Sequence, residues 1–162
     1  MPKLKTAKGN NSPPLEKSRN YYIKPFPKTT RITSVVFDGP AHNGPYRGSI
    51  DFVMQLGTPI LAPLDGKVID VVDLNEKYGP SEEFVNDLNY ITIRHQNGDF
   101  SQVAHLTKGS SKVKEGDTVS AGQQIAVTGN SGWMTEPHLH FFVFRLEKDK
   151  HGFKGLDPQF KE

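Results

Sequence analysis

Apolar and polar positions along the chain predict many short strands and no long helix. Residues 89–95 alternate with a period of two, a polar, glycine-containing turn follows, and residues 100–105 return the chain, which predicts a β-hairpin. Shorter runs rich in β-branched and aromatic residues predict further strands at 31–37, 49–53, 60–62, 67–72 and 138–144. The pattern therefore predicts an all-β domain, built as a two-sheet antiparallel barrel or sandwich.

Glycine and proline residues lie between many of these predicted strands. The chain has 15 glycines and 12 prolines, which favours frequent turns. An Asp65-Gly66 turn is expected to join the strands at 60–62 and 67–72. Residues 73–88 are polar and are expected to form a surface insertion, with one helical turn after Ser81.

The chain divides by composition into a tail, residues 1–30, and a β domain, residues 31–162. The tail carries seven lysines and arginines against one acid, Glu16, and its prolines exclude a helix. We expect a flexible, solvated tail. Weak attraction to an anionic surface, such as a cell wall or lipid, is the functional alternative.

Charge and composition exclude several classes of function. A net charge of +2 is too small to indicate nucleic-acid binding, and no apolar run is long enough for stable membrane insertion. The N-terminus lacks the apolar segment of a signal peptide, so the sequence leaves localisation open between the cytoplasm, a processed chain and unconventional export. Because the chain has no cysteine, disulfides, thiolate metal ligands and thiol nucleophiles are excluded.

Candidate chemistry begins with His138 and His140 in the strand predicted at 138–144. Residues at i and i+2 of a strand share one face, so the two imidazoles project together while Leu139 and Phe141 face the other way. Such a pair suits a metal site or an acid/base pair. For an isolated pair of this kind, two partly buried structural histidines would be the preferred interpretation.

Other polar residues at strand ends and loop edges change that preference. His42, His105 and Asp51 join the two histidines as candidates, and Asp51 stands in an apolar setting where a carboxylate needs a partner. A catalytic zinc site takes three protein ligands and keeps one position for water. Two histidines and one carboxylate meet this need, and the other two histidines remain for acid/base or oxyanion roles. The HExxH helix and the G-x-S-x-G elbow are absent from the sequence.

Three ordered blocks resemble the lysostaphin-like zinc metalloendopeptidases. The first block comprises His42, Asp51-Phe52, Gly57-Thr58-Pro59, Ala62, Asp65-Gly66 and Val68. The second comprises Ala104-His105-Leu106, Val113, Gly116-Asp117, Val119, Gly122-Gln123 and Ile125. The third comprises Gly129-Asn130-Ser131-Gly132 and Pro137-His138-Leu139-His140-Phe141. The resemblance covers about residues 31–160 and implies a barrel of the duplicated-hybrid-motif type.

This resemblance implies one Zn²⁺ per chain, bound by His42, Asp51 and His140, with His105 and His138 as the catalytic pair. It implies hydrolysis of peptide bonds in bacterial peptidoglycan, in the cell envelope or outside the cell, by a zinc-activated water. Two departures stand out. Many family members have a ligand histidine four residues before the aspartate, where this chain has Arg47, so His42 would serve through a longer loop. Glu136 stands where small residues are common.

Two other classes of function compete with the enzyme. A catalytically inactive relative would bind and activate a cell-wall hydrolase, and its mark would be lost ligands. A lipoyl- or biotin-carrier domain resembles residues 113–125, but no lysine stands in a suitable turn. Four loop residues are expected near the substrate groove, either contacting substrate or anchoring the loops: Tyr46, Asn130, Trp133 and Met134. The sequence leaves the oligomeric state and the cleaved bond open.

Overall fold

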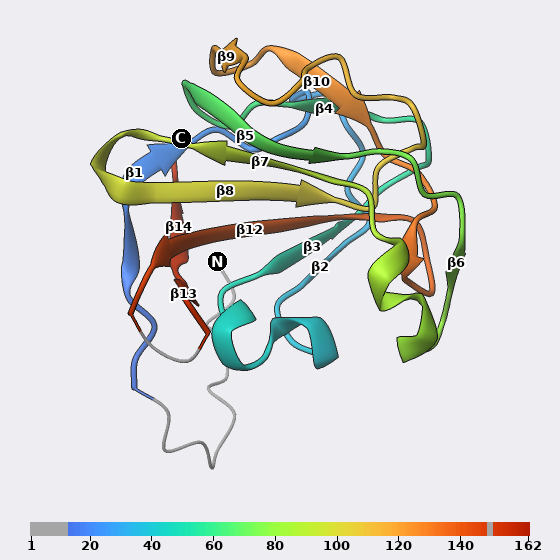
Figure 1. Ribbon diagram of the computed structural model, residues 1–162, viewed down its shortest axis with the longest axis horizontal. Helices are drawn as coiled ribbons and strands as arrows, with labels where there is room; N and C mark the ends of the chain where they lie inside the picture. The colour runs from blue at the N-terminus through green and yellow to red at the C-terminus, as the bar shows by residue number, and fades with distance from the viewer. Residues whose placement is uncertain (1–12, 149–150) are drawn as a thin grey trace.

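The computed structural model describes residues 13–148 and 151–162 and has an eight-stranded antiparallel sheet as its main element (Figure 1). Seven strands follow the order β2-β3-β12-β8-β7-β5-β9, and β13 pairs with β12. Their bounds are β2 (Ser34–Val36), β3 (Ile50–Val53), β5 (Gly66–Val72), β7 (Tyr90–Arg94), β8 (Asp99–Ala104), β9 (Thr118–Val119), β12 (His138–Leu146) and β13 (Phe153–Gly155). The predicted all-β fold class is confirmed.

Three two-stranded sheets surround the main sheet. They pair β4 (Pro59–Leu61) with β10 (Gln124–Val127) in antiparallel fashion, and β1 (Lys17–Tyr22) with β14 (Asp157–Phe160) and β6 (Tyr78–Gly79) with β11 (Gly132–Trp133) in parallel. Short 3-10 helices are η1 (Pro40–His42), η2 (Gly44–Tyr46), η3 (Glu82–Asp87) and η4 (Gln96–Gly98). None of the helices in the described part of the chain is long and apolar enough to span a membrane.

Strand β12 separates the hydrophobic core from the cleft. Leu139, Phe141 and Val143 are fully buried in the core on one face. His138 and His140 lie on the opposite face, as the period of two predicts. Because β12 pairs with both β3 and β8, His140 lies directly across from Asp51 on one side and from Ala104 on the other.

The predicted hairpin at 89–105 is confirmed as β7 and β8. Its turn is η4, where Asn97 and Gly98 take φ of 63° and 76°, the left-handed conformation that Asn and Gly adopt most readily. The Asp65-Gly66 turn instead carries the chain between sheets, because β4 pairs with β10 while β5 pairs with β7 and β9. The predicted surface insertion contains the expected helical turn as η3.

The prediction of a flexible tail over residues 1–30 is wrong for its central part. Residues 17–22 form β1, and the side chains of Tyr22 and Phe26 are buried in the core. The backbone N–H groups of Arg19 and Asn20 donate to the carboxylate of buried Asp99, at 2.8 and 3.0 Å. Prolines exclude a helix here but leave an edge strand possible. Residues 1–12 lie outside the described residues.

Candidate active site

His42, Asp51 and His140 form a compact group at one end of β12. Asp51 lies on β3 between the two rings, 3.1 Å from its Oδ2 to Nε2 of His42 and 2.8 Å from its Oδ1 to Nδ1 of His140. One ligand atom from each residue lies within 4.8 Å of the other two. The three predicted metal ligands, contributed by η1, β3 and β12, therefore converge on one point.

The hydrogen bonds of His42 orient its ring toward this point. Its Nδ1 donates to the carbonyl oxygen of Ser49 at 2.7 Å, so Nε2 is the nitrogen that faces Asp51 and, in the neutral ring, the one available to bind a metal. A backbone carbonyl on the outer ring nitrogen is the usual way in which proteins fix the tautomer of a metal-binding histidine. Two imidazoles and a carboxylate are nitrogen and oxygen donors that suit Zn²⁺. The residues present therefore fit a divalent metal.

Electrostatics keep Asp51 ionised. Burial favours the neutral acid, but hydrogen bonds from His140 and His42 outweigh it and hold the pKa of Asp51 well below its usual range. Burial lowers the pKa of His42, whereas its hydrogen bond to Asp51 raises it, and the net pKa lies above its ordinary value. The site therefore has a permanent negative charge at its centre, as a cation site requires.

His105 and His138 lie beside this group, with ring centroids 4.4 Å apart. His105 follows β8 with a φ of 66° and donates from Nδ1 to the carbonyl oxygen of Ser131 at 2.6 Å. Nδ1 of His138 lies 2.8 Å from the carbonyl oxygen of Glu136, and its Nε2 lies 3.6 Å from Oδ2 of Asp51. Burial, together with the nearby charge of His138, lowers the pKa of His105 to about 3, so its ring is neutral at pH 7.

The two departures from the family pattern lie outside this group. Arg47 points away and donates to the carbonyl oxygen of Pro13 at 2.9 Å. Glu136 has an exposed side chain and contributes its backbone carbonyl to the orientation of His138. Neither side chain is among the three residues whose ligand atoms converge.

A cleft of about 450 Å³ opens beside the histidines. Tyr46 and Trp133 line it together with His105 and His140, as expected from the sequence, whereas Asn130 and Met134 are not among its lining residues. Sequence reasoning missed the remaining lining residues: Pro40, Ala41, Val85, Asn86, Leu88, Tyr90, Gln102, Phe142, Phe144 and Phe153. Phe142 and Phe144 continue the two-residue spacing of His138 and His140, and this spacing was the signal available for them.

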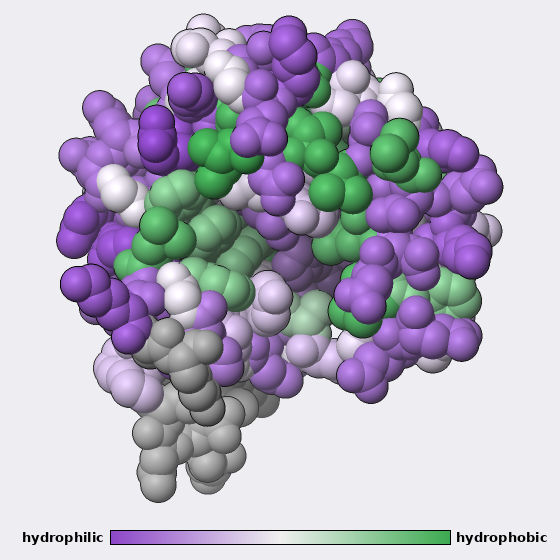
Figure 2. Space-filling view, in the orientation of Figure 1, coloured by the Kyte–Doolittle hydropathy of each residue, from purple (hydrophilic) through white to green (hydrophobic). Residues whose placement is uncertain are grey.

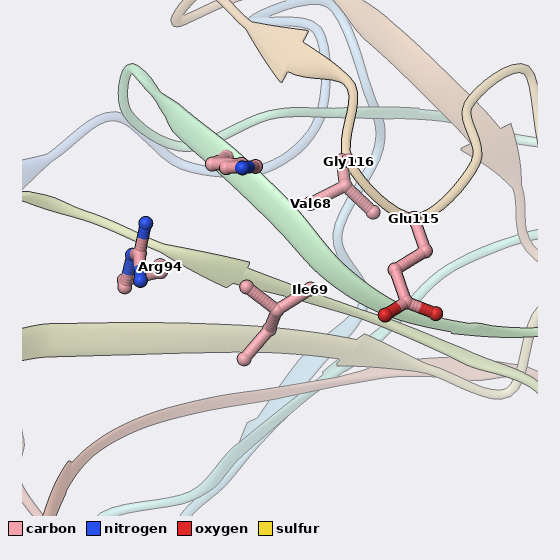
Figure 3. A pocket seen from close by; sticks show the side chains of 6 residues that line it. Val68, Ile69, Arg94, Glu115 and Gly116 are labelled. Atoms are coloured by element: carbon pink, nitrogen blue, oxygen red, sulfur yellow. The ribbon is translucent and has the colours of Figure 1, made fainter.

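A second hollow, of about 420 Å³, lies over β5 and β7, away from the histidines (Figure 3). Arg94 and Glu115 stand on its two sides and Ile69 lies between them (Figure 3). It contains none of the predicted site residues. The cleft beside β12 is therefore the candidate active site.

Comparison with known proteins shows the family of the chain. The family model for peptidase family M23 matches residues 45–152, a region that includes Asp51, His105, His138 and His140 and begins just after His42. The peptidoglycan DD-endopeptidase ShyA of Vibrio cholerae is 39% identical over 114 residues, which cover 70% of this chain and 24% of ShyA. Lysostaphin of Staphylococcus simulans is 38% identical over 100 residues, which cover 61% of this chain and 18% of lysostaphin.

Solved structures give the same result. The catalytic domain of lysostaphin from Staphylococcus simulans superposes with a TM-score of 0.53 at 28% identity, covering 84% of this chain and 86% of that domain. A zinc-containing peptidase from Vibrio cholerae superposes with a TM-score of 0.56 at 31% identity, covering 76% of this chain and 36% of that one. The chain spans about a quarter or less of the length of the two curated relatives. With two thirds of its residues matched by the family model, this chain belongs to peptidase family M23.

Proposed function

We propose that this chain is a zinc endopeptidase that hydrolyses peptide bonds in bacterial peptidoglycan. The observation that carries the proposal is the convergence of His42, Asp51 and His140 beside a second histidine pair. Relatives named as peptidoglycan endopeptidases support the substrate class. Such a substrate lies in the cell envelope, so the proposal includes action there.

His42, Asp51 and His140 would hold one Zn²⁺. When bound, zinc supplies a Lewis acid that polarises a carbonyl and brings the pKa of a coordinated water near neutrality. The chain's own contribution is to fix these ligands, through the Ser49 carbonyl on His42 and the pairing of β3 with β12. The assignment of His42 as a ligand rests on this geometry alone, because the region matched by the family model begins at residue 45.

His105 and His138 would handle protons at the scissile bond. His105 is neutral at pH 7 and its Nδ1 is engaged by Ser131, so its Nε2 is the atom suited to take a proton from the attacking water. His138 would donate a hydrogen bond to the developing oxyanion or a proton to the leaving amine. The walls of the cleft would exclude bulk water from the reacting atoms.

The test measures zinc per chain and release of soluble fragments from purified peptidoglycan on the same samples. We expect about one zinc in the wild type, and loss of both zinc and activity in His42→Ala. The matched control is Arg47→Ala, which changes a residue of the same loop outside the His42–Asp51–His140 group. This variant should keep both zinc and activity. His105→Ala should keep zinc and lose about 10²- to 10⁴-fold in turnover.

Other outcomes would overturn parts of the proposal. Zinc and activity retained in His42→Ala would remove His42 from the site. A folded, zinc-loaded wild type without hydrolysis would instead support an inactive relative that binds or activates a cell-wall hydrolase.

A further inference from the structure

A row of aromatic side chains continues from the histidines along the cleft face of β12. His140, Phe142 and Phe144 are each two residues apart, so their side chains share one face of the strand. Phe144 stacks in a nearly parallel arrangement on Phe142 and on Phe100 of β8, with centroid distances of 5.2 Å in both cases. The metal-ligand end of the strand therefore leads directly into an aromatic surface.

Two further rings complete this surface. Tyr46 packs on Phe142 and Phe153 at 5.5 and 5.4 Å, and Phe153 packs on Phe144 at 5.6 Å. We call Tyr46, Phe142, Phe144 and Phe153 the aromatic shelf, and all four line the cleft beside His140. Figure 2 shows hydrophobic residues gathered over β8 and β12 on this face, with hydrophilic residues around them.

Away from the histidines and the candidate metal site, the cleft offers no partner for a charged group. Apart from the histidines, its polar lining residues are amides and phenols: Asn86, Gln102, Tyr46 and Tyr90. The Tyr90 hydroxyl already donates to Asp70 at 3.0 Å. Among the residues that the structure describes, no Asp, Glu, Lys or Arg lines the cleft. A charged side chain placed on the shelf would lose its hydration without gaining a counter-charge, which is unfavourable.

The spacing along β12 assigns the shelf to a position in the substrate. Two strand residues span about 6.8 Å, and an extended peptide covers nearly the same distance in two residues. A peptide that lies along β12 with its scissile bond near His140 therefore brings its second residue from that bond to the level of Phe142. Phe142 itself is buried, and Tyr46 and Phe144, which pack on it, carry the accessible aromatic surface there.

We infer that the aromatic shelf is a subsite for an uncharged, apolar residue about two positions from the cleaved bond. It selects against Asp, Glu, Lys and Arg there. This inference rests on the proposed function in one respect, namely that the substrate is a peptide. Beyond the proposed function, the inference names the residues of the chain that set the substrate preference.

Trp133 makes binding measurable without hydrolysis, because it is the only tryptophan of the chain and lines the cleft. The probes are blocked alanine pentapeptides that carry a single Leu, Glu or Lys at each position in turn, titrated with zinc-loaded protein and followed by fluorescence. At one position we expect the Leu peptide to bind about tenfold more tightly than the Glu and Lys peptides. Equal affinity at every position would overturn the inference.

Two variants test the shelf itself. Phe144→Ala should reduce the preference for Leu to about twofold, and Tyr46→Lys should make the Glu peptide the tightest binder. Tyr46 is 44% exposed, so the fold should tolerate a lysine at this position. If Phe144→Ala does not fold, the result for Tyr46→Lys alone tests the shelf. Phe37, 51% exposed and outside the cleft lining, gives the matched controls Phe37→Ala and Phe37→Lys, which should bind like wild type. A Tyr46→Lys protein with unchanged preference would contradict the shelf.

Hydrolysis of peptidoglycan and of the same peptides, measured in parallel, separates the two proposals. Hydrolysis without any preference in binding would overturn the shelf and leave the proposed function intact. A Phe144-dependent preference without hydrolysis would support the shelf and overturn the proposed function. Binding of N,N′-diacetylchitobiose that Phe144→Ala abolishes, with no discrimination among peptides, would assign the shelf to the glycan and overturn the inference.

Discussion

His95 is a buried histidine outside the candidate active site. Its Nδ1 lies 2.8 Å from the carbonyl oxygen of Asp65, and its Nε2 lies 2.7 Å from the hydroxyl of Ser101. A neutral ring that donates from Nδ1 and accepts at Nε2 satisfies both partners. Burial accordingly lowers the pKa of His95.

This lowered pKa predicts acid sensitivity of the fold. The unfolded chain, in which a histidine has a pKa near 6.5, binds a proton that the folded chain excludes, so stability falls as the pH drops below about 6.5. The expected loss is about 1.4 kcal/mol per pH unit for this one residue. Urea denaturation of wild type and His95→Gln between pH 5 and 8 measures it. The variant should show the shallower pH dependence, and parallel curves would contradict this.

At the residue scale, sequence reasoning succeeded where a local period decides the outcome. The shared face of His138 and His140 follows from their spacing. Leu139 and Phe141 were predicted on the opposite face, and there they are buried in the core. The positive φ of His105 has no signal in the sequence, because a left-handed conformation is unusual for histidine and tertiary contacts impose it. The orientation of each ring depends on carbonyl groups that only the folded chain brings near.

The loop between η1 and β3 positions His42, and Gly48 fixes that loop. Gly48 has a φ of 90°, and a Cβ there would collide with the backbone carbonyl of Leu156. Gly48→Ala should therefore displace the loop and lower zinc affinity by at least tenfold. Gly44→Ala is the matched control, since its φ of 57° is also positive but its Cβ would meet nothing within 4 Å. Competition with a fluorescent zinc chelator measures both, and equal affinities would contradict the assignment.

Strand β1 shows why the predicted tail boundary was wrong. The charged residues of β1 predicted a solvent-exposed segment, but every second side chain of the strand is buried. The carboxylate of Asp99 on β8 accepts hydrogen bonds from two backbone N–H groups of β1, some 80 residues earlier in the sequence. A local pattern cannot reveal a partner so far along the chain. Asp99 also accepts from Arg145 at 3.2 Å, so a single buried carboxylate joins β1, β8 and β12.

Removing that carboxylate should loosen β1 and destabilise the protein. Asp99→Ala removes the acceptor of the Arg19 and Asn20 N–H groups and leaves Arg145 paired with Glu16 alone. The loss should cost about 3–5 kcal/mol of unfolding free energy. Glu76→Ala breaks an exposed pair with Lys108 and should cost less than about 1 kcal/mol. Urea denaturation at pH 7 compares them. A loss for Asp99→Ala no larger than that for Glu76→Ala would show that β1 is held in another way.

At the scale of the whole molecule, the class of fold was predictable and its assembly was not. Strand length, turn residues and the absence of a helical period are local and predicted an all-β domain. The pairing of β1 with β14 and of β6 with β11 is parallel and joins segments far apart in the sequence. The sequence has no turn signal for such pairs, because parallel strands cannot be joined by a tight hairpin turn.

The proposed zinc would link β12 to η1 and β3, about 90 residues earlier in the chain, so its removal should weaken the whole fold. A metal that binds only the folded state adds about 2.7 kcal/mol at a free concentration of 100 times its Kd. For a domain of this size, that corresponds to about 5–10 °C in Tm. Calorimetry of wild type with zinc and with a chelator should show this difference. Asp51→Ala should show none, because the chelator then has no bound metal to remove, and an equal shift in both proteins would place the stabilising metal at another site.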